Sequence, residues 1–303
     1  MVKNIFFIAL SILIFQNGYS QTFMEIKENK LLLGGTPTLP DLRPVSFGSL
    51  DSLFSILKNE KIEYRYVNGS CEDRAHYISL LLKKMLIASG KIWNFSPARV
   101  TLISDELFKV KDPYGISDSV IYWGYHVAPV FTAKNKMGEV DTLVFDQSFS
   151  PNSFIIYNDW LKTMKCPRSV FTFTDIDSYL FNSLNRLTVY DNSLNPAPSY
   201  AMPKFFPGII TGDFWKLDPT NDYVQSGLAV NDLAYYMFMS AASDKYSEKE
   251  KAYLYKLIKD IDKVEGFIKS ERPVEISKST HKELVEYYNA RIGHWNTKYG
   301  LLK

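Results

Sequence analysis

The scarcity of cysteine is the feature that most constrains how this chain can fold. Only two cysteines, Cys71 and Cys166, occur in 303 residues, which is too few for a disulfide-built scaffold or a structural zinc site. The fold must therefore rest on a hydrophobic core. The composition supplies one, because 46% of the residues are hydrophobic and 15% are aromatic. With 22% of its residues charged, the chain does not have the composition of a disordered protein.

The charged residues nearly cancel. The chain has 35 lysines and arginines against 33 aspartates and glutamates, which gives a formal net charge of +2. This balance provides no basic field that would attract nucleic acid. The four histidines also leave little material for a metal centre. We therefore expect neither a nucleic-acid partner nor a bound metal.

The N-terminal segment has the pattern of a secretory signal peptide. Lys3 gives a positive charge before an apolar run from Ile5 to Phe15, and Gly18 and Ser20 are small residues at the −3 and −1 positions of a cleavage site. The run is too short to span a bilayer, which takes about 20 apolar residues. We expect cleavage after Ser20 and a secreted or periplasmic protein with no membrane anchor in its mature form. A buried N-terminal helix is the alternative.

A helix is predicted from Cys71 to Ser89. It follows a turn at residues 68–70, and Gly90 is expected to end it. Ser70 and Asp73 have the spacing of a capping box, in which the Ser70 side chain accepts a hydrogen bond at the start of the helix.

This position would give Cys71 a chemical advantage. Unpaired backbone N–H groups and the helix dipole at a helix N-terminus favour a thiolate, which is the nucleophilic form of cysteine. The same N–H groups can stabilise an oxyanion in acyl transfer. A disulfide between Cys71 and Cys166 is the alternative, and the position alone does not decide between the two.

A β-hairpin is predicted next. Residues 120–133 and 139–145 have strand-forming patterns and flank a turn. With the turn centred on Lys136, His126 lies opposite Asp146, and such opposed residues have Cβ atoms about 4.5–5.5 Å apart. A neighbouring aspartate fixes the tautomer of an imidazole and stabilises its charged form. His126 and Asp146 are therefore a candidate base and its orienting carboxylate, with a purely structural histidine as the alternative.

Three short strings around these residues resemble the motifs of the bacterial protein-glutaminases, which are secreted enzymes that deamidate glutamine side chains in proteins. The strings carry a cysteine at a helix N-terminus, a histidine in a strand and an aspartate at a strand end, in this order. They are Ser70-Cys71-Glu72-Asp73-Arg74-Ala75-His76, Tyr122-Trp123-Gly124-Tyr125-His126-Val127-Ala128 and Val144-Phe145-Asp146-Gln147-Ser148. The resemblance covers residues 45–228.

The resemblance implies an α+β fold of the transglutaminase and papain type, in which the cysteine-bearing helix packs on an antiparallel sheet. Cys71 would be the nucleophile, His126 the base and acid, and Asp146 the orienting carboxylate. The implied reaction is hydrolysis of a glutamine carboxamide through a Cys thioester, with release of ammonia and without a metal or organic cofactor. The implied partners are proteins or peptides that bear exposed glutamine.

Other uses of the same residues stay open. A transglutaminase would pass the thioester to a lysine amine, and a cysteine protease would cleave the main chain with the same triad. A secreted binding protein could also keep this scaffold without catalysis, with Cys71 unreactive or in a disulfide.

The expected organisation is a signal peptide at residues 1–20, a protein-glutaminase-like catalytic domain at residues 21–228 and a helical C-terminal extension at residues 229–303. Within the extension, a capping box at residues 247–250 opens one helix and residues 280–283 open another.

An apolar stripe on the extension must be buried, because a stripe of this width is costly to leave in water. It either stabilises the catalytic domain by packing on it or partly covers the Cys71 cleft. The stripe consists of Leu254, Leu257, Ile258, Ile261 and Ile268.

Overall fold

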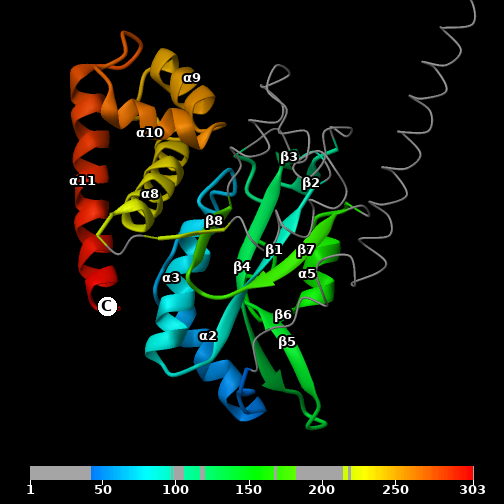
Figure 1. Cartoon of the computed structure of the whole chain (residues 1–303). Helices are drawn as coiled ribbons and strands as arrows, with labels where there is room; N and C mark the ends of the chain where they lie inside the picture. Colours follow the sequence, from blue (N-terminus) through cyan, green and yellow to red (C-terminus); the bar gives the residue numbers. More distant parts are fainter. Residues whose placement is uncertain are drawn as a thin grey trace, which may run out of the picture.

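The computed structural model describes residues 42–96, 98, 106–116, 120–166, 169–181, 214–217 and 220–302. The expected signal peptide lies outside the described residues. The described part is an α+β structure, in which an antiparallel sheet carries helices on both faces and further helices gather near the C-terminus (Figure 1). None of the described helices is long and apolar enough to cross a bilayer.

The main sheet has five strands in the order β6-β5-β4-β1-β7, and all its pairs are antiparallel. Its strands are β1 (Ser89–Phe95), β4 (Tyr125–Lys134), β5 (Val140–Val144), β6 (Ile155–Ile156) and β7 (Val170–Thr174). Two further antiparallel pairs join β2 (Phe108–Lys111) to β3 (Val120–Trp123) and β8 (Ser178–Phe181) to β9 (Phe214–Lys216).

The helices fall into an N-terminal and a C-terminal group. The first comprises the short 3-10 helix η2 (Phe47–Ser49), α2 (Leu50–Lys58), α3 (Cys71–Lys84) and α5 (Tyr157–Thr163). The second comprises α8 (Tyr223–Ala241), α9 (Glu248–Leu257), α10 (Ile261–Lys269) and α11 (Lys278–Gly300).

The main sheet is buried on both faces, because alternate residues of β4 pack on different helices. Phe131 belongs to the same apolar cluster as Leu82 of α3. Ala128 points the other way and belongs to the cluster that contains Trp160 of α5. His126 shares the face of Ala128, and its ring stacks on Trp160.

The hairpin of β4 and β5 forms with a different register from the predicted one. The observed strand partners centre the turn on Met137 rather than on Lys136. The cause is the turn type: the Gly138 N–H donates to the Asn135 carbonyl, and Gly138 has a left-handed φ of 84°, as in a three-residue hairpin loop. Moving the turn centre by one residue shifts the pairing by two. His126 therefore keeps its predicted face of the sheet.

Helix α3 begins at Cys71, as predicted, but its cap differs. Ser70 has a left-handed φ of 58° and makes no side-chain capping bond. Its hydroxyl donates instead to the Gly227 carbonyl at 3.1 Å. The predicted capping box between Ser70 and Asp73 is therefore wrong, because a contact distant in sequence takes the Ser70 side chain.

The end of α3 also differs from the prediction. The helix ends at Lys84, and Gly90, its predicted stop, lies inside β1. Leu86 takes the role expected of glycine, with a left-handed φ of 61°. The N–H groups of Leu86 and Ile87 donate to carbonyls of the last helical turn, each at 2.9 Å. These two hydrogen bonds form a Schellman motif.

Helix α8 was not predicted as a separate helix, although residues 229–241 belong to the expected helical extension, and it packs on both α3 and α11. It runs continuously across residues 228 and 229, so the expected domain boundary divides one helix. Gly227 permits its close approach to α3, since a Cβ atom there would lie 1.9 Å from Asp73 Oδ2.

The capping box of the C-terminal extension is confirmed. Ser247 accepts a hydrogen bond from the Glu250 N–H, and the Glu250 carboxylate accepts one from the Ser247 N–H. The expected single stripe is instead divided between two helices, because α9 ends at Leu257 and Asp260 caps α10.

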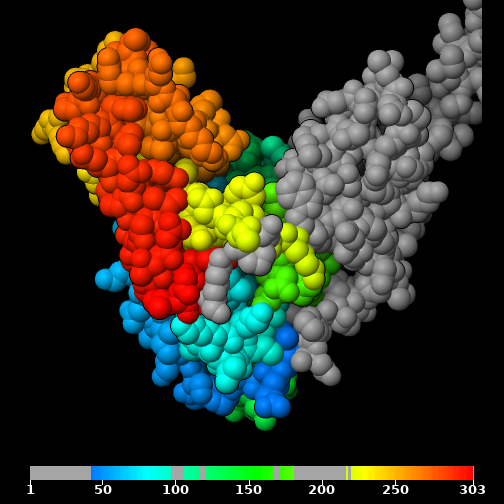
Figure 2. All heavy atoms as spheres, turned by 60° about the vertical axis from the view of Figure 1, so that its left-hand side comes forward, coloured from blue at the N-terminus to red at the C-terminus, as the bar shows by residue number. Residues whose placement is uncertain are grey.

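Helix α11 begins at Lys278 rather than at Thr280, because Ser277 caps it. Its far end packs on α3, where the rings of Trp295 and Tyr77 meet with centroids 5.4 Å apart. In the space-filling view the red end of α11 lies against the cyan surface of the N-terminal helices (Figure 2). The extension therefore packs on the cysteine-bearing helix.

Candidate active site

A pocket of about 260 Å³ lies at the N-terminal end of α3. Residues 67–72, 122–126 and 261–262 line it. It thus joins the start of α3, the β3–β4 junction and the start of α10. The wall includes both Cys71 and His126, which are 55 positions apart in the sequence (126 − 71).

Asp146 lies directly behind His126. The Asp146 Oδ2 atom is 2.8 Å from His126 Nε2 and accepts a second hydrogen bond from Trp160 Nε1 at 2.8 Å. The Ser148 N–H donates to the other carboxylate oxygen at 3.0 Å. Burial raises the pKa of Asp146, but the charge and hydrogen bond of His126 and the bond from Trp160 outweigh it. The pKa of Asp146 is therefore below its ordinary value, and the carboxylate is ionised at neutral pH.

Aromatic rings hold the His126 imidazole in place. The ring stacks on Trp123 and on Trp160, with centroids 4.6 and 5.4 Å away, and Phe149 meets it edge-on at 5.6 Å. Because Asp146 occupies Nε2, the other ring nitrogen, Nδ1, is the one left to exchange a proton.

Cys71 is the first residue of α3 and is half-buried. Its Sγ atom lies 3.2 Å from Glu72 Oε2, to which the thiol donates. Burial, followed by the nearby Glu72 carboxylate, raises the pKa of the thiol well above its usual value. Arg74 and a backbone hydrogen bond from Val127 act in the opposite direction but do not prevail. The helix N-terminus therefore does not by itself produce the expected thiolate.

Neither Cys71 nor Cys166 is in a disulfide, so the structure lacks the alternative bond between them. Cys166 is buried in the cluster around Trp160 on the α5 face of the sheet. Among the described residues, no group of three or more His, Cys, Asp and Glu side chains is arranged to hold a metal ion.

The structure brings the three predicted residues into one region: Cys71 and His126 share a pocket wall, and Asp146 bonds to His126 from behind. Two neighbours were missed by the sequence analysis. Trp160 meets Asp146 only through the tertiary fold, and no local pattern indicates it. Glu72 is adjacent to Cys71 in sequence, which was the one available signal.

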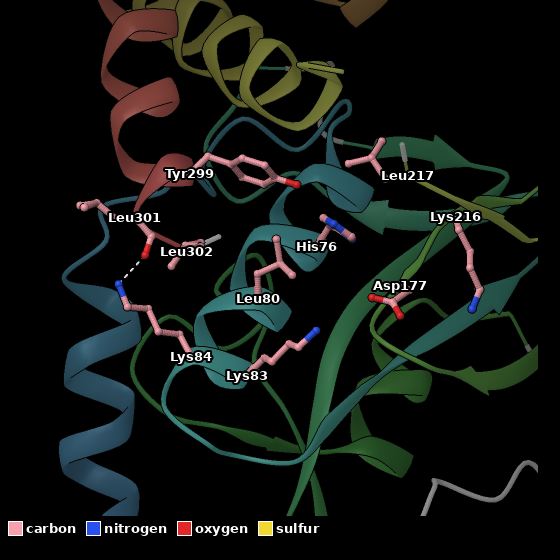
Figure 3. Close-up of a pocket in the computed structure, with 10 residues that line it drawn as sticks. All are labelled: His76, Leu80, Lys83, Lys84, Asp177, Lys216, Leu217, Tyr299, Leu301 and Leu302. Atoms are coloured by element: carbon pink, nitrogen blue, oxygen red, sulfur yellow. Dashed lines mark hydrogen bonds between the residues drawn. The ribbon is translucent and has the colours of Figure 1, made fainter. Parts of the chain in front are cut away.

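A larger cavity of about 810 Å³ lies along the other half of α3 (Figure 3). His76, Lys83 and Lys84 of α3 face it together with the end of α11, where the Leu301 carbonyl accepts a hydrogen bond from Lys84. Neither Cys71 nor His126 belongs to its lining, so the smaller pocket is the candidate active site.

Comparison with known proteins finds a family similar to part of the chain. The family model described as glutaminase matches residues 21–164. Residues 165–228, which the sequence resemblance includes, lie outside this match. No protein in the curated set matches the chain.

Solved structures with similarity to the chain are protein-glutaminases. The solution structure of protein-glutaminase from Chryseobacterium proteolyticum has 16% identity and a TM-score of 0.41, covering 68% of this chain and 93% of that one. A crystal structure of protein-glutaminase has 20% identity and a TM-score of 0.37, covering 52% and 94%.

A crystal structure of pro-protein-glutaminase has 19% identity and a TM-score of 0.37, covering 53% of this chain and 63% of that one. The present chain thus spans less than two thirds of the pro-protein. The family model, by contrast, includes all three candidate residues, Cys71, His126 and Asp146. Residues 21–164 of the chain are thus similar to the glutaminase family.

Proposed function

We propose that the protein is a hydrolase that deamidates glutamine side chains of proteins or peptides, with Cys71 as nucleophile, His126 as base and acid, and Asp146 as orienting carboxylate. One observation carries this proposal. A single pocket presents a thiol at a helix N-terminus together with an imidazole whose far nitrogen bonds to a buried carboxylate. This is the arrangement that nucleophilic acyl transfer requires.

In the first step, the Cys71 thiol gives its proton to His126 Nδ1, and the sulfur attacks the carbon of the glutamine carboxamide. The unpaired N–H groups of the first turn of α3 stabilise the oxyanion that forms. His126 then returns the proton to the nitrogen, ammonia leaves, and a thioester joins the substrate to Cys71.

In the second step, His126 removes a proton from water, and the resulting hydroxide attacks the thioester. The C–S bond breaks, glutamate is released, and the proton goes back to the sulfur of Cys71. Asp146 holds the imidazole tautomer throughout and stabilises its cationic form.

The raised pKa of the Cys71 thiol supports the need for His126. Because burial disfavours the isolated thiolate, the sulfur becomes an effective nucleophile only when a base accepts its proton at the moment of attack. The imidazole of His126, in the same pocket, is that base.

The size of the pocket supports a side chain as the group that enters it. Its volume of about 260 Å³ is below the range of about 300–1,000 Å³ typical for drug-sized ligands. We accordingly propose exposed glutamine on flexible segments as the substrate. From the signal-peptide pattern of residues 1–20, we also propose a secreted or periplasmic location after their removal.

The experiment is to incubate the purified protein with a glutamine-rich protein and to measure ammonia release and product mass. We expect ammonia and a mass increase of about 1 Da per glutamine, both absent in Cys71→Ala. Equal activity in Cys71→Ala would end the proposal. Covalent dimers would indicate a transglutaminase, fragments a protease, and no product at all a binding protein.

A further inference from the structure

Glu72 occupies a position in the pocket that the reaction outlined above does not use. It is the second residue of α3 and part of the pocket wall, and its carboxylate accepts the hydrogen bond from the Cys71 thiol at 3.2 Å. A group bound at the sulfur therefore has this carboxylate as a neighbour.

The charge of Glu72 has no direct ionic partner, although the buried Lys91 interacts with it electrostatically. Within the described residues, no ion pair involves Glu72, and the pocket lining contains no lysine or arginine. Arg74 is the cation whose charge acts on Cys71, and its guanidinium donates instead to the Tyr66 carbonyl and the Asn231 side chain. Asp262, at the start of α10, adds a second, exposed carboxylate to the lining.

Substrate and product of a deamidase differ at one place, where the carboxamide NH2 becomes a carboxylate oxygen. The NH2 group donates hydrogen bonds and is neutral, whereas the carboxylate only accepts them and is negative. A carboxylate beside the nucleophile therefore attracts the first and repels the second.

We propose that Glu72 is the specificity-determining residue of the pocket, which selects a carboxamide over a carboxylate. This inference rests on the proposed function and deepens it. At rest, Glu72 accepts the hydrogen bond of the thiol. When a glutamine side chain enters, its NH2 group takes the place of the thiol as donor to Glu72, and the thiol proton is free to move to His126. After hydrolysis, like charge drives the glutamate product out.

The test uses two alkylating probes that differ in the same way as substrate and product. Iodoacetamide carries a carboxamide and iodoacetate a carboxylate. In both reactions the Cys71 sulfur forms a bond to carbon, the C–I bond breaks, iodide leaves with the electron pair, and the thiol proton passes to solvent. A Cys166→Ala background leaves Cys71 as the single thiol of the chain. The readout is the alkylation rate with iodoacetamide divided by the rate with iodoacetate. This ratio is then divided by the same ratio for a small free thiol, which removes the intrinsic difference between the probes.

We expect Cys71 to favour iodoacetamide by about tenfold or more beyond the small thiol, since the Glu72 carboxylate repels the anionic probe and not the neutral one. Glu72→Gln and Glu72→Ala should each return the ratio to that of the small thiol. Use of both variants covers the failure of either one to fold, which circular dichroism detects.

Asp262→Asn provides the matched control, because it removes a carboxylate from the same pocket wall at an exposed site. It should change the ratio by less than about a third of the Glu72→Gln effect, since water screens exposed charges. An unchanged ratio in the folded Glu72 variants overturns the proposal, and so does an equal effect of Asp262→Asn.

Alkylation requires no deamidation, so the two proposals fail separately. If the Glu72 variants lose the probe preference but the parent protein releases no ammonia, Glu72 still selects by charge and the proposed reaction is wrong. If the parent protein releases ammonia but shows no probe preference, the proposed reaction holds and the role of Glu72 is wrong. Where both hold, Glu72→Gln should also strengthen inhibition by a glutamate-containing product peptide relative to the parent protein.

Discussion

Helix α3 borders two cavities, one at its N-terminal end and one along its C-terminal half, and each contains a histidine. In the smaller cavity, His126 bonds to the carboxylate of Asp146 at 2.8 Å. In the larger one, His76 Nδ1 lies 2.9 Å from the Nζ atom of Lys91, which is fully buried. The same helix therefore separates an imidazole next to an anion from an imidazole next to an amine.

This difference decides which cavity can perform acid–base chemistry. Burial and then the charge of Lys91 lower the pKa of His76 to about 3, while burial lowers the pKa of Lys91 to about 7. His76 therefore stays neutral at physiological pH and serves as a hydrogen-bond partner. His126, in contrast, has the buried carboxylate of Asp146 as its hydrogen-bond partner. The neighbouring charge therefore favours the smaller pocket as the candidate active site, although the other cavity is about three times larger (about 810 against 260 Å³).

The largest expected effect is a difference in deamidation activity between variants of the two histidines. His126→Ala should lower kcat/KM for glutamine deamidation by about 10⁴-fold, because it removes the proposed base and acid. His76→Gln should keep kcat/KM within about threefold, because its side chain lies outside the Cys71 pocket. Both are measured by ammonia release on folded protein. A similar loss in both variants would contradict the assignment of the two cavities.

The next effect concerns the contact that fixes the N-terminal end of α3. Gly227→Ala should lower the free energy of unfolding by about 3 kcal/mol, because its Cβ would overlap Asp73, which is buried and bonded to the Tyr179 hydroxyl. Gly266→Ala is the matched control in α10, where nothing lies within 4 Å of the added Cβ.

The control should raise stability by about 0.5–1 kcal/mol, since alanine favours helix over glycine. Urea unfolding of both variants measures the difference. If Gly227→Ala behaved like Gly266→Ala, the close approach of α8 to α3 would not exist in solution.

The third expected effect is a pH dependence of the free energy of unfolding that arises from His76. The pKa of His76 falls from 6.5 in the unfolded chain to about 3 in the folded one, so the unfolded state binds the extra proton between these values. Stability from the neutral His76 is therefore complete above pH 6.5 and is lost as the pH falls toward 3. The slope reaches at most about 1.4 kcal/mol per pH unit.

The measurement is urea unfolding of the parent protein and His76→Gln at pH values between about 4 and 7. The stability advantage of the parent should shrink as the pH falls, because the variant lacks this titration. Asp73 and Lys91 also titrate with shifted pKa values, but both proteins contain them. A pH-independent difference would show that His76 is not held neutral by its surroundings.

The local parts of the fold could be predicted from the sequence. The start of α3 at Cys71, the hairpin and the Ser247 capping box depend on residues close together in the chain. The proximity of His126 and Asp146 survived an error in the turn centre, because a two-residue shift keeps the face of a strand. The capping box predicted for Ser70 failed, because the Ser70 hydroxyl bonds instead to the distant Gly227 carbonyl.

The bounds of helix α8 could not be predicted, because it is buried on several sides and lacks a single apolar face. Its polar residues are also used internally: Asp232 accepts hydrogen bonds from Arg291 and Trp295 of α11, each at 2.7 Å. Such pairs join positions about sixty residues apart, which no local pattern records. The bonds from Trp160 to Asp146 and from Cys71 to Glu72 likewise depend on side-chain geometry.

The smallest expected effect lies at the C-terminal end of α3, away from the Cys71 pocket. Leu86 holds a left-handed φ of 61° with its side chain 93% exposed, so its Cβ adds backbone strain without packing in return. Leu86→Gly should therefore raise the free energy of unfolding by about 0.5–1 kcal/mol and leave kcat/KM unchanged. Leu86→Ala, which keeps the Cβ and removes the exposed remainder, should leave stability unchanged in the same urea titration. An equal gain in both variants would mean that the exposed side chain, not the backbone, limits stability at this end of the helix.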